Sequence, residues 1–408
     1  MNRLFLIIAL VLVCFFSYAQ KVVFYSDTLL FTMVSKAVPL FVGKTEEKKD
    51  VLAYYEDLNN CNFLKEVSQQ LDVYKKEYIL NDFYMAQILE KLCLLLAPKV
   101  SNKHQKMLMY CVLRYMKYDV RLAYLGNNYF VLAFSDTELF NHPYLLVKNK
   151  KYYSIHRSSY KSSFSSSIDY IISDNHKFFT YSIANVPLLK KPIYENKNIL
   201  LYKSRCIFYD EKSESYLRGK IKEIVVDTVM LNFIFNKSLI DLYKDLPIIE
   251  NSKYFNLDLS DSLHKQVFQY LESQKLGLTK QDTLKNLVKF VRSIGEYKTD
   301  IEAYKREFPM FPEEALYYMY TDCEDRNALL FYLTKKVLNL PMIILDYPNH
   351  INIGVAIKGN YKQSVKYKGG IYYVCEASSG GAVVEIGESN AFNTYPHPKI
   401  IGEYIPVH

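Results

Sequence analysis

The sequence predicts an α+β protein that contains more than one domain. Apolar residues recur at helical spacing in some segments, and short β-type runs alternate with turn residues in others. In the last third of the chain, helical segments precede a series of short strands, which is an order typical of α+β folds. The chain has 408 residues and half of them are hydrophobic. That length exceeds what one hydrophobic core usually serves, so two or three domains are expected.

Residues 20–190 are expected to form an N-terminal α+β domain. The spacing of apolar residues predicts helices over residues 83–96 and 106–116. Residues 119–134 are typical of two strands joined by a Gly-Asn-Asn turn, and residues 144–155 are typical of a hairpin.

Residues 191–256 are expected to form a β-rich middle module because they contain several short β-type runs. The C-terminal domain, residues 257–408, begins instead with helices. Thr279 and Asp282 form a capping box that predicts the start of one helix, and a second helix is expected to begin near Cys323. The strands that follow are expected at residues 342–346, 351–357 and 371–376.

The first nineteen residues are typical of a signal peptide. Arg3 gives a positive start, residues 4–16 are apolar and uncharged, and Ala19 ends a small-residue cleavage pattern. We expect cleavage after Ala19 and a secreted or periplasmic location, with a retained anchor or a lipid at Cys14 as the alternative. No later segment is long and apolar enough to span a bilayer, so no membrane span is expected in the mature chain.

Composition argues against several partners and cofactors. The formal net charge is +8, but Lys and Arg are spread along the chain without a basic stripe, so no nucleic-acid partner is expected. Neither a zinc-type Cys/His spacing nor an EF-hand loop is present, and we expect no metal and no cofactor. Cys93 and Cys111 lie within apolar helical patterns and are expected to be buried thiols, so no disulfide framework is implied.

Cys323 has the most informative sequence context. Thr321 and Asp322 are residue types that cap helices, so Cys323 is expected in the first turn of a helix. The exposed N–H groups there and the positive end of the helix dipole favour a thiolate, which is the nucleophilic form. His350, at the start of an expected strand, would act as its base, and Glu376, on another strand, would orient the imidazole. These three side chains form a candidate catalytic triad.

The segments around these residues resemble the Cys, His and acid motifs of the transglutaminase-like superfamily. The motifs are Asp-Cys-Glu-Asp-Arg at residues 322–326, Asp-Tyr-Pro-Asn-His at 346–350 and Tyr-Tyr-Val-Cys-Glu-Ala-Ser at 372–378. The resemblance covers residues 256–408 and is to bacterial cysteine peptidases and amidases, in particular exported proteins of the Bacteroidetes type. It implies a papain-like domain of a helix and an antiparallel sheet. The chain departs from the family pattern at the acid, where Glu376-Ala-Ser stands in place of Asp-Pro-Thr.

The resemblance implies an exported thiol hydrolase that cleaves a peptide or amide bond through an acyl-enzyme. It favours hydrolysis over crosslinking, and peptides or proteins, cell-wall peptides among them, as substrates. The chain contains no Trp to serve as a side-chain donor in an oxyanion hole. The sequence leaves the oligomeric state open. The alternative is a catalytically weak or inactive protein of the same fold that acts as a binding or scaffolding module of the cell envelope.

A weak internal repeat favours that alternative. In the first and third parts of the chain, a helix is followed by two strands and then by a Tyr-Tyr strand at nearly the same offset. The N-terminal domain is therefore expected to be a degenerate copy that has lost its chemistry, with two unrelated α+β domains of similar strand spacing as the alternative. The Cys position falls near Ser101 or Asn102, the His position near Asn127 and the acid position at His156, which is expected to be a surface histidine.

Three neighbours of the candidate triad are expected to have structural roles. Asp325 and Arg326 are expected to form an ion pair on the helix surface or behind the catalytic residues. Cys375 precedes Glu376 on a strand, so its side chain should face the opposite side of the sheet as a buried thiol.

Overall fold

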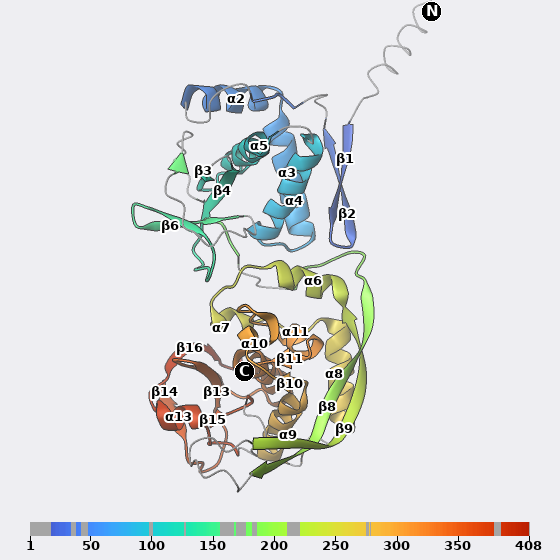
Figure 1. Ribbon diagram of the computed structural model, residues 1–408, viewed down its shortest axis with the longest axis vertical. Helices are drawn as coiled ribbons and strands as arrows, with labels where there is room; N and C mark the ends of the chain where they lie inside the picture. Colours follow the sequence, from blue (N-terminus) through green and yellow to red (C-terminus); the bar gives the residue numbers. More distant parts are fainter. Residues whose placement is uncertain are drawn as a thin grey trace, which may run out of the picture. The chain divides into compact units, whose positions relative to one another are not determined.

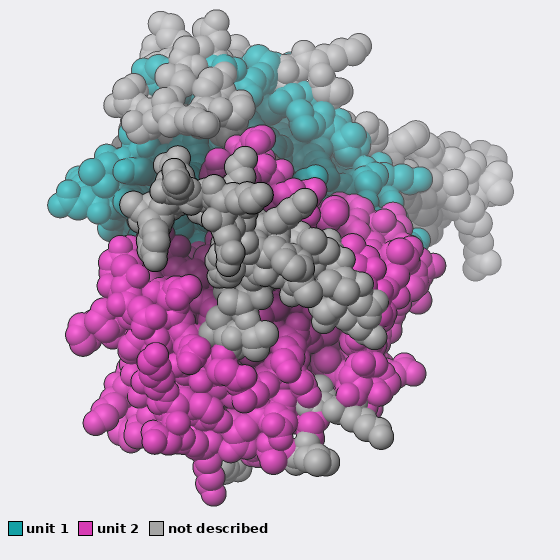
Figure 2. Space-filling model, turned by 60° about the horizontal axis from the view of Figure 1, so that its bottom comes forward, with its two compact units in different colours: residues 1–183, 187–192, 244–249 teal, residues 184–186, 193–243, 250–408 magenta. Residues whose placement is uncertain are grey.

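The computed structural model describes residues 18–33, 38–41, 48–97, 101–125, 128–155, 167–168, 177–181, 186–209, 221–274, 277, 279–378 and 385–407. Its helices and antiparallel sheets confirm the predicted α+β class. Contacts within the chain divide it into two compact units (Figure 2). Unit 1 consists of residues 1–183, 187–192 and 244–249, and unit 2 of residues 184–186, 193–243 and 250–408. The apolar part of the expected signal peptide lies outside the described residues.

Within the described part of the chain, no helix combines the length and the apolar character needed to cross a bilayer.

Unit 1 begins with a hairpin and four helices. The elements are β1 (Tyr18–Phe24), β2 (Asp27–Met33), α2 (Lys48–Asn60), α3 (Phe63–Glu77), α4 (Asp82–Leu96) and α5 (Asn102–Tyr115). The side-chain oxygen of Asn81 accepts the Tyr84 N–H and so caps α4, whereas Ser101 caps α5 in the same way. These helices confirm the two predicted from apolar spacing, although α5 starts four residues earlier than expected. Cys93 and Cys111 are buried on them, as predicted.

A five-stranded antiparallel sheet follows the helices of unit 1. The strands are β3 (Val120–Leu125), β4 (Asn128–Phe134), β5 (Tyr144–Val147), β6 (Lys150–Ser154) and β7 (Ser167–Ile168), in the order β5-β6-β4-β3-β7. The expected strand pair and hairpin are confirmed as β3–β4 and β5–β6. Helix α5 packs against β3 and β4.

Unit 2 begins with a long two-stranded ribbon of β8 (Tyr194–Tyr209) and β9 (Ile221–Asn236). This ribbon lies within residues 191–256, the expected middle module, and it is grouped with the C-terminal residues in one compact unit. The helices that follow along the chain are α6 (Lys237–Asp245), α7 (Asn251–Tyr254), α8 (Asp261–Ser273), α9 (Lys280–Ser293), α10 (Asp300–Tyr304), α11 (Pro312–Tyr317) and α12 (Cys323–Leu338) (Figure 1). The Thr279 hydroxyl accepts the Asp282 N–H at the start of α9, which confirms the predicted cap.

The sheet of unit 2 also has five antiparallel strands. They are β12 (Met342–Tyr347), β13 (His350–Val355), β14 (Ser364–Tyr367), β15 (Gly370–Cys375) and β16 (Lys399–Tyr404), in the order β14-β15-β13-β12-β16. The short strands β10 (Glu296–Tyr297) and β11 (Tyr320–Thr321) pair in parallel, and α13 (Asn390–Thr394) precedes β16. Helix α12 packs against α9, α11 and β13, so its first turn is enclosed.

The two five-stranded sheets share one strand order. In each unit, the strands can be numbered from one to five along the chain, starting with the first strand after the helix that packs on the sheet (α5 or α12). The spatial order of the strands is then 3-4-2-1-5 in both sheets. The helix–strand contact is also alike. Asn102, the first residue of α5, accepts the Tyr129 N–H through its side chain at 2.8 Å, and the Cys323 sulfur, at the first position of α12, accepts the Ile351 N–H. These matches support the hypothesis of an internal duplication. Asn127 and His156 lie outside the described residues.

Asn327 joins the first turn of α12 to the start of β13. Its side chain is fully buried, and its Nδ2 donates to the Cys323 carbonyl at 2.9 Å and to the Ile351 carbonyl at 2.8 Å. This amide therefore fixes the helix end that carries Cys323 relative to the strand that begins at His350.

Substitution Asn327→Ala should lower the free energy of unfolding by about 1–3 kcal/mol, because it leaves a buried carbonyl of β13 without its donor. Chemical denaturation measures this change. The matched control is Asn360→Ala, since Asn360 is exposed in a loop of the same unit and its truncation should cost little. Equal effects of the two substitutions would contradict the assigned role of Asn327.

Candidate active site

Cys323 is the first residue of α12, as the sequence predicts. The Asp322 N–H donates to Asp325 Oδ2 at 3.1 Å, which closes the capping turn in front of it. Only 8% of Cys323 is exposed, and the Ile351 N–H donates to its sulfur. The thiol thus lies against the start of β13, one residue beyond His350.

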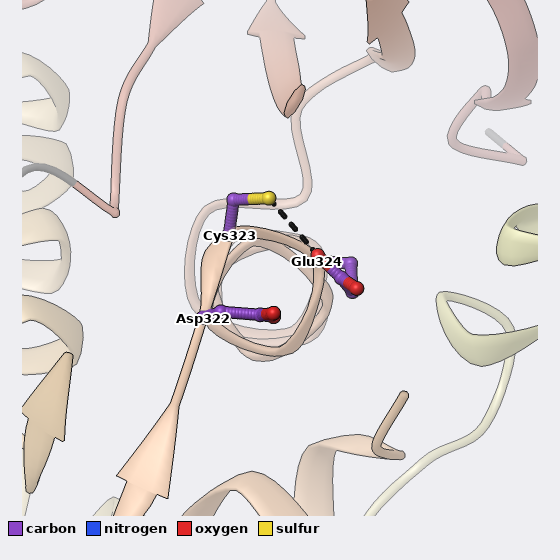
Figure 3. Close-up of side chains that lie close together, drawn as sticks. All are labelled: Asp322, Cys323 and Glu324. Atoms are coloured by element: carbon purple, nitrogen blue, oxygen red, sulfur yellow. Dashed lines mark hydrogen bonds between the residues drawn. The ribbon is translucent and has the colours of Figure 1, made fainter. Parts of the chain in front are cut away.

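The electrostatic surroundings of Cys323 favour the thiol over the thiolate. Its S–H group donates to Glu324 Oε2 at 2.9 Å (Figure 3). Burial, followed by the carboxylates of Glu324 and Asp322, raises the pKa of Cys323 well above its ordinary value. This direction runs against the expectation that the helix N-terminus favours a thiolate, because burial and two adjacent acidic side chains favour the protonated form.

His350 and Glu376 form a direct hydrogen-bonded pair. The distance from His350 Nε2 to Glu376 Oε2 is 2.8 Å, although 26 residues separate them along the chain. His350 lies at the first position of β13 with 21% of its side chain exposed, whereas Glu376 follows the end of β15 and is 5% exposed. A buried carboxylate thus faces one ring nitrogen of a partly accessible imidazole. The extra methylene of Glu relative to Asp does not prevent this contact.

The pairing with Glu376 determines the protonation of His350. Burial alone lowers the pKa of His350, but the hydrogen bond and charge of Glu376 outweigh burial and raise it above 6.5. In the neutral ring, the proton on Nε2 is held by the carboxylate, so Nδ1 is left as the proton acceptor. That tautomer is the one that a general base acting through Nδ1 requires.

Glu376 is the centre of a buried polar network. Its Oε1 accepts from both the N–H and the hydroxyl of Ser378, and its Oε2 accepts from the Ser389 hydroxyl at 3.1 Å as well as from His350. Although burial raises the pKa of Glu376, these bonds lower it below 4.5 overall. Arg292 on α9 also donates through Nε to the Glu376 carbonyl at 3.0 Å. Main chain and carboxylate are therefore both held in place.

Asn352, Ser389 and Arg292 were not identified from the sequence. Asn352 Oδ1 lies 2.9 Å from His350 Nε2, and Asn352 Nδ2 donates to the Ser389 hydroxyl at 2.8 Å. Asn352 is two residues after His350 on the same strand. Because side chains alternate between the two faces of a strand, the sequence could have predicted that both lie on one face. Ser389 and Arg292 come from distant segments, and the sequence gives no local signal for them.

Burial of Asp325 and Arg326 contradicts the expected position on the helix surface and leaves the alternative, a position behind the catalytic residues, as a prediction. Their exposed fractions are 0% and 1%, so neither lies on the helix surface, because α9, α11 and β13 enclose the first turn of α12. Arg326 donates to the Thr321 hydroxyl at 3.0 Å and to the Ile294 carbonyl at 3.1 Å, which ties α12 to the end of α9. Cys375 is buried, as predicted.

Comparisons with family models, with curated proteins and with solved structures find no match to this chain.

Substitution Glu376→Gln should lower the pKa of His350, because the amide keeps an acceptor but removes the negative charge. NMR titration of the imidazole C–H signals measures this shift, with Glu388→Gln, at an exposed position of the same unit, as the control. An unchanged His350 titration in the Glu376 variant would contradict the assigned pairing.

The same pair sets the sign of the pH dependence of folding. The His350 pKa is raised on folding, so its stabilisation is fully present below the unfolded pKa of about 6.5 and is lost as pH rises through the folded value. The Glu376 pKa is lowered, so its stabilisation is present above 4.5 and is lost as pH falls through the folded value. In Glu376→Gln, the free energy of unfolding measured as a function of pH should change less in both pH ranges.

Proposed function

We propose that unit 2 is a transglutaminase-like domain and that the protein is a thiol hydrolase of peptide or amide bonds. The observation that carries the proposal is the 2.8 Å contact between His350 and Glu376, at the strand start against which Cys323 packs. An imidazole whose Nε2 is bound to a buried carboxylate is oriented as the base of a nucleophilic triad. The secondary structure around the triad, a helix that begins at the Cys followed by an antiparallel sheet, agrees with the motif resemblance.

Because the Cys323 thiol is protonated before the reaction, its proton must be transferred as the sulfur attacks. His350 Nδ1 takes the Cys323 proton as the sulfur bonds to the substrate carbonyl carbon, and the backbone N–H groups at the start of α12 stabilise the oxyanion. The C–N bond then breaks, and the imidazolium protonates the leaving amine. Water attacks the thioester while His350 accepts its proton. The carboxylic acid product leaves, and that proton returns to the sulfur.

Glu324 is the group that opposes this reaction in the resting state, since it accepts the hydrogen bond of the thiol. Its side chain is partly exposed, so a substrate that displaces it would release the S–H group toward the base. On this proposal, substrate binding and nucleophile activation are linked through one carboxylate.

The second candidate function is a binding or scaffolding module of the cell envelope. The raised pKa of Cys323 favours it, because a thiol that resists ionisation is a weak nucleophile. Unit 1, whose sheet has the same strand order, carries Asn102 where unit 2 carries Cys323. The signal-peptide pattern supports a secreted or periplasmic location for either function, and extracellular or cell-wall peptides as targets.

An activated acyl donor separates the two functions without knowledge of the substrate. The full chain should form a covalent adduct with N-acetyl-glutamine 4-nitrophenyl ester, visible as a burst of nitrophenol and as one acyl group in the intact mass. Cys323→Ser should slow the burst by at least about 1,000-fold. The matched control is Cys61→Ser, which removes a partly buried thiol from unit 1. Absence of the adduct in the unsubstituted protein, or its persistence in Cys323→Ser, would contradict the hydrolase proposal.

A further inference from the structure

Asn352 is a polar side chain at a fully buried position of β13. Its exposed fraction is 0%, and Ile351 and Ile353 precede and follow it on the strand. A buried amide costs free energy unless hydrogen bonds satisfy both its donor and its acceptor. In Asn352, Oδ1 lies 2.9 Å from His350 Nε2, and Nδ2 donates to the Ser389 hydroxyl at 2.8 Å. The amide therefore makes contacts at this position that an apolar side chain of the same size could not make.

Four side chains, those of His350, Glu376, Ser389 and Asn352, form a closed ring of hydrogen bonds. Glu376 Oε2 lies 2.8 Å from His350 Nε2 and accepts the Ser389 hydroxyl at 3.1 Å. Asn352 completes the ring, because it contacts both Ser389 and His350. Two acceptors, one charged and one neutral, thus converge on the same nitrogen of the imidazole.

The chemistry of the four groups fixes the direction of each bond. Glu376 is held ionised by its donors and can only accept. The Ser389 hydroxyl has one proton, which it donates to Glu376, so its oxygen accepts from Asn352 Nδ2 and, at 3.5 Å, from the Phe392 N–H. Since Nδ2 faces Ser389, the carbonyl oxygen of the Asn352 amide faces His350. The orientation of this amide is therefore set by Ser389 and not by the imidazole itself.

Gln363 holds Ser389 in the place that this orientation requires. Gln363 is 5% exposed, and its side-chain oxygen accepts the Ser389 N–H, while its Nε2 donates to the Ser389 carbonyl at 3.1 Å. The same Nε2 donates to Asn393 Oδ1 on α13 at 2.8 Å. Both main-chain groups of Ser389 are thus bound by one buried side chain, so the hydroxyl is presented to Asn352 from a fixed backbone.

We propose that Asn352 is a positioning residue for His350, whose carbonyl is a second acceptor for the Nε2 proton and stabilises the doubly protonated ring that forms when His350 takes up a proton. This role rests on the proposed hydrolase function, in which His350 is the base. Glu376 supplies a charge from one direction and Asn352 a dipole from another, so the plane of the ring is restrained at two points. Nδ1 is left free to take up the proton.

Several groups act on the protonation of the His350 ring. Burial lowers the pKa of His350, whereas the hydrogen bond and charge of Glu376, the hydrogen bond to Asn352 and the charge of Glu324 raise it. Tyr347 on β12 also lies beside the ring, with the two ring centroids 6.2 Å apart. Unlike the carboxylates, Asn352 does not ionise, so its contribution to the ring is the same at every pH.

NMR titration of the His350 C–H signals in the full chain, without a substrate, tests this role. Asn352→Leu keeps nearly the same volume but removes the acceptor. We expect it to lower the proton affinity of the ring by about 2- to 12-fold, which corresponds to one net hydrogen bond of about 0.5–1.5 kcal/mol. The matched control is Asn390→Leu, at the exposed first position of α13, which should leave the His350 titration unchanged.

A purely structural Asn352 would change the free energy of unfolding but not the titration. An unchanged or higher proton affinity of His350 in folded Asn352→Leu, or an equal decrease in Asn390→Leu, would overturn the assigned role. If Asn352→Leu does not fold, the side-chain amide signals of Asn352 in the unsubstituted protein provide the test. They should shift with the same midpoint as His350, and signals that do not follow this titration would overturn the role. Absence of the nitrophenyl-ester adduct together with the expected titration shift would contradict the hydrolase function alone.

Discussion

The candidate site depends on one constraint, the need to satisfy the buried carboxylate of Glu376. A charged group that is 5% exposed must be surrounded by donors, and four reach it: the His350 ring, the Ser378 N–H, the Ser378 hydroxyl and the Ser389 hydroxyl. These donors come from β13, from the segment after β15 and from the residue before α13. One carboxylate thus holds together three segments of unit 2 and orients the imidazole.

Charge is distributed unevenly across the site. On the His350 side, each acidic oxygen has donors, and the carboxylate stabilises a proton on the imidazole. On the Cys323 side, Asp322 Oδ1 has no hydrogen-bond donor among the described residues, and burial together with Glu324 and Asp322 keeps the proton on the sulfur. Burial and these acidic side chains therefore favour the protonated thiol at Cys323, while Glu376 orients the His350 ring. On the proposed hydrolase function, a change in the acidic surroundings of Cys323 would ease loss of the thiol proton.

Local patterns in the sequence predicted much of the fold. Apolar spacing and the Thr279 cap identify α4 and α9, and alternating runs identify β5–β6 and the strands around His350, because these signals reside in neighbouring residues. The network around Glu376 could not be predicted in full, since Arg292 and Ser389 reach it from distant segments. Of the two positions expected for Asp325 and Arg326, the helix surface is wrong: polar residues in a first helical turn usually face solvent, whereas here three elements pack on the helix and both residues are buried.

The most direct test of the account is the rate at which iodoacetamide alkylates Cys323 at neutral pH, followed by peptide mass spectrometry. The account predicts slower labelling in His350→Ala, which lacks the base, and faster labelling in Glu324→Gln, which loses the charge that holds the thiol proton. Glu272→Gln, at an exposed position on α8, should label like the unsubstituted protein. Equal rates in all four proteins would show that neither residue controls the thiol, and the binding-module function would then be preferred.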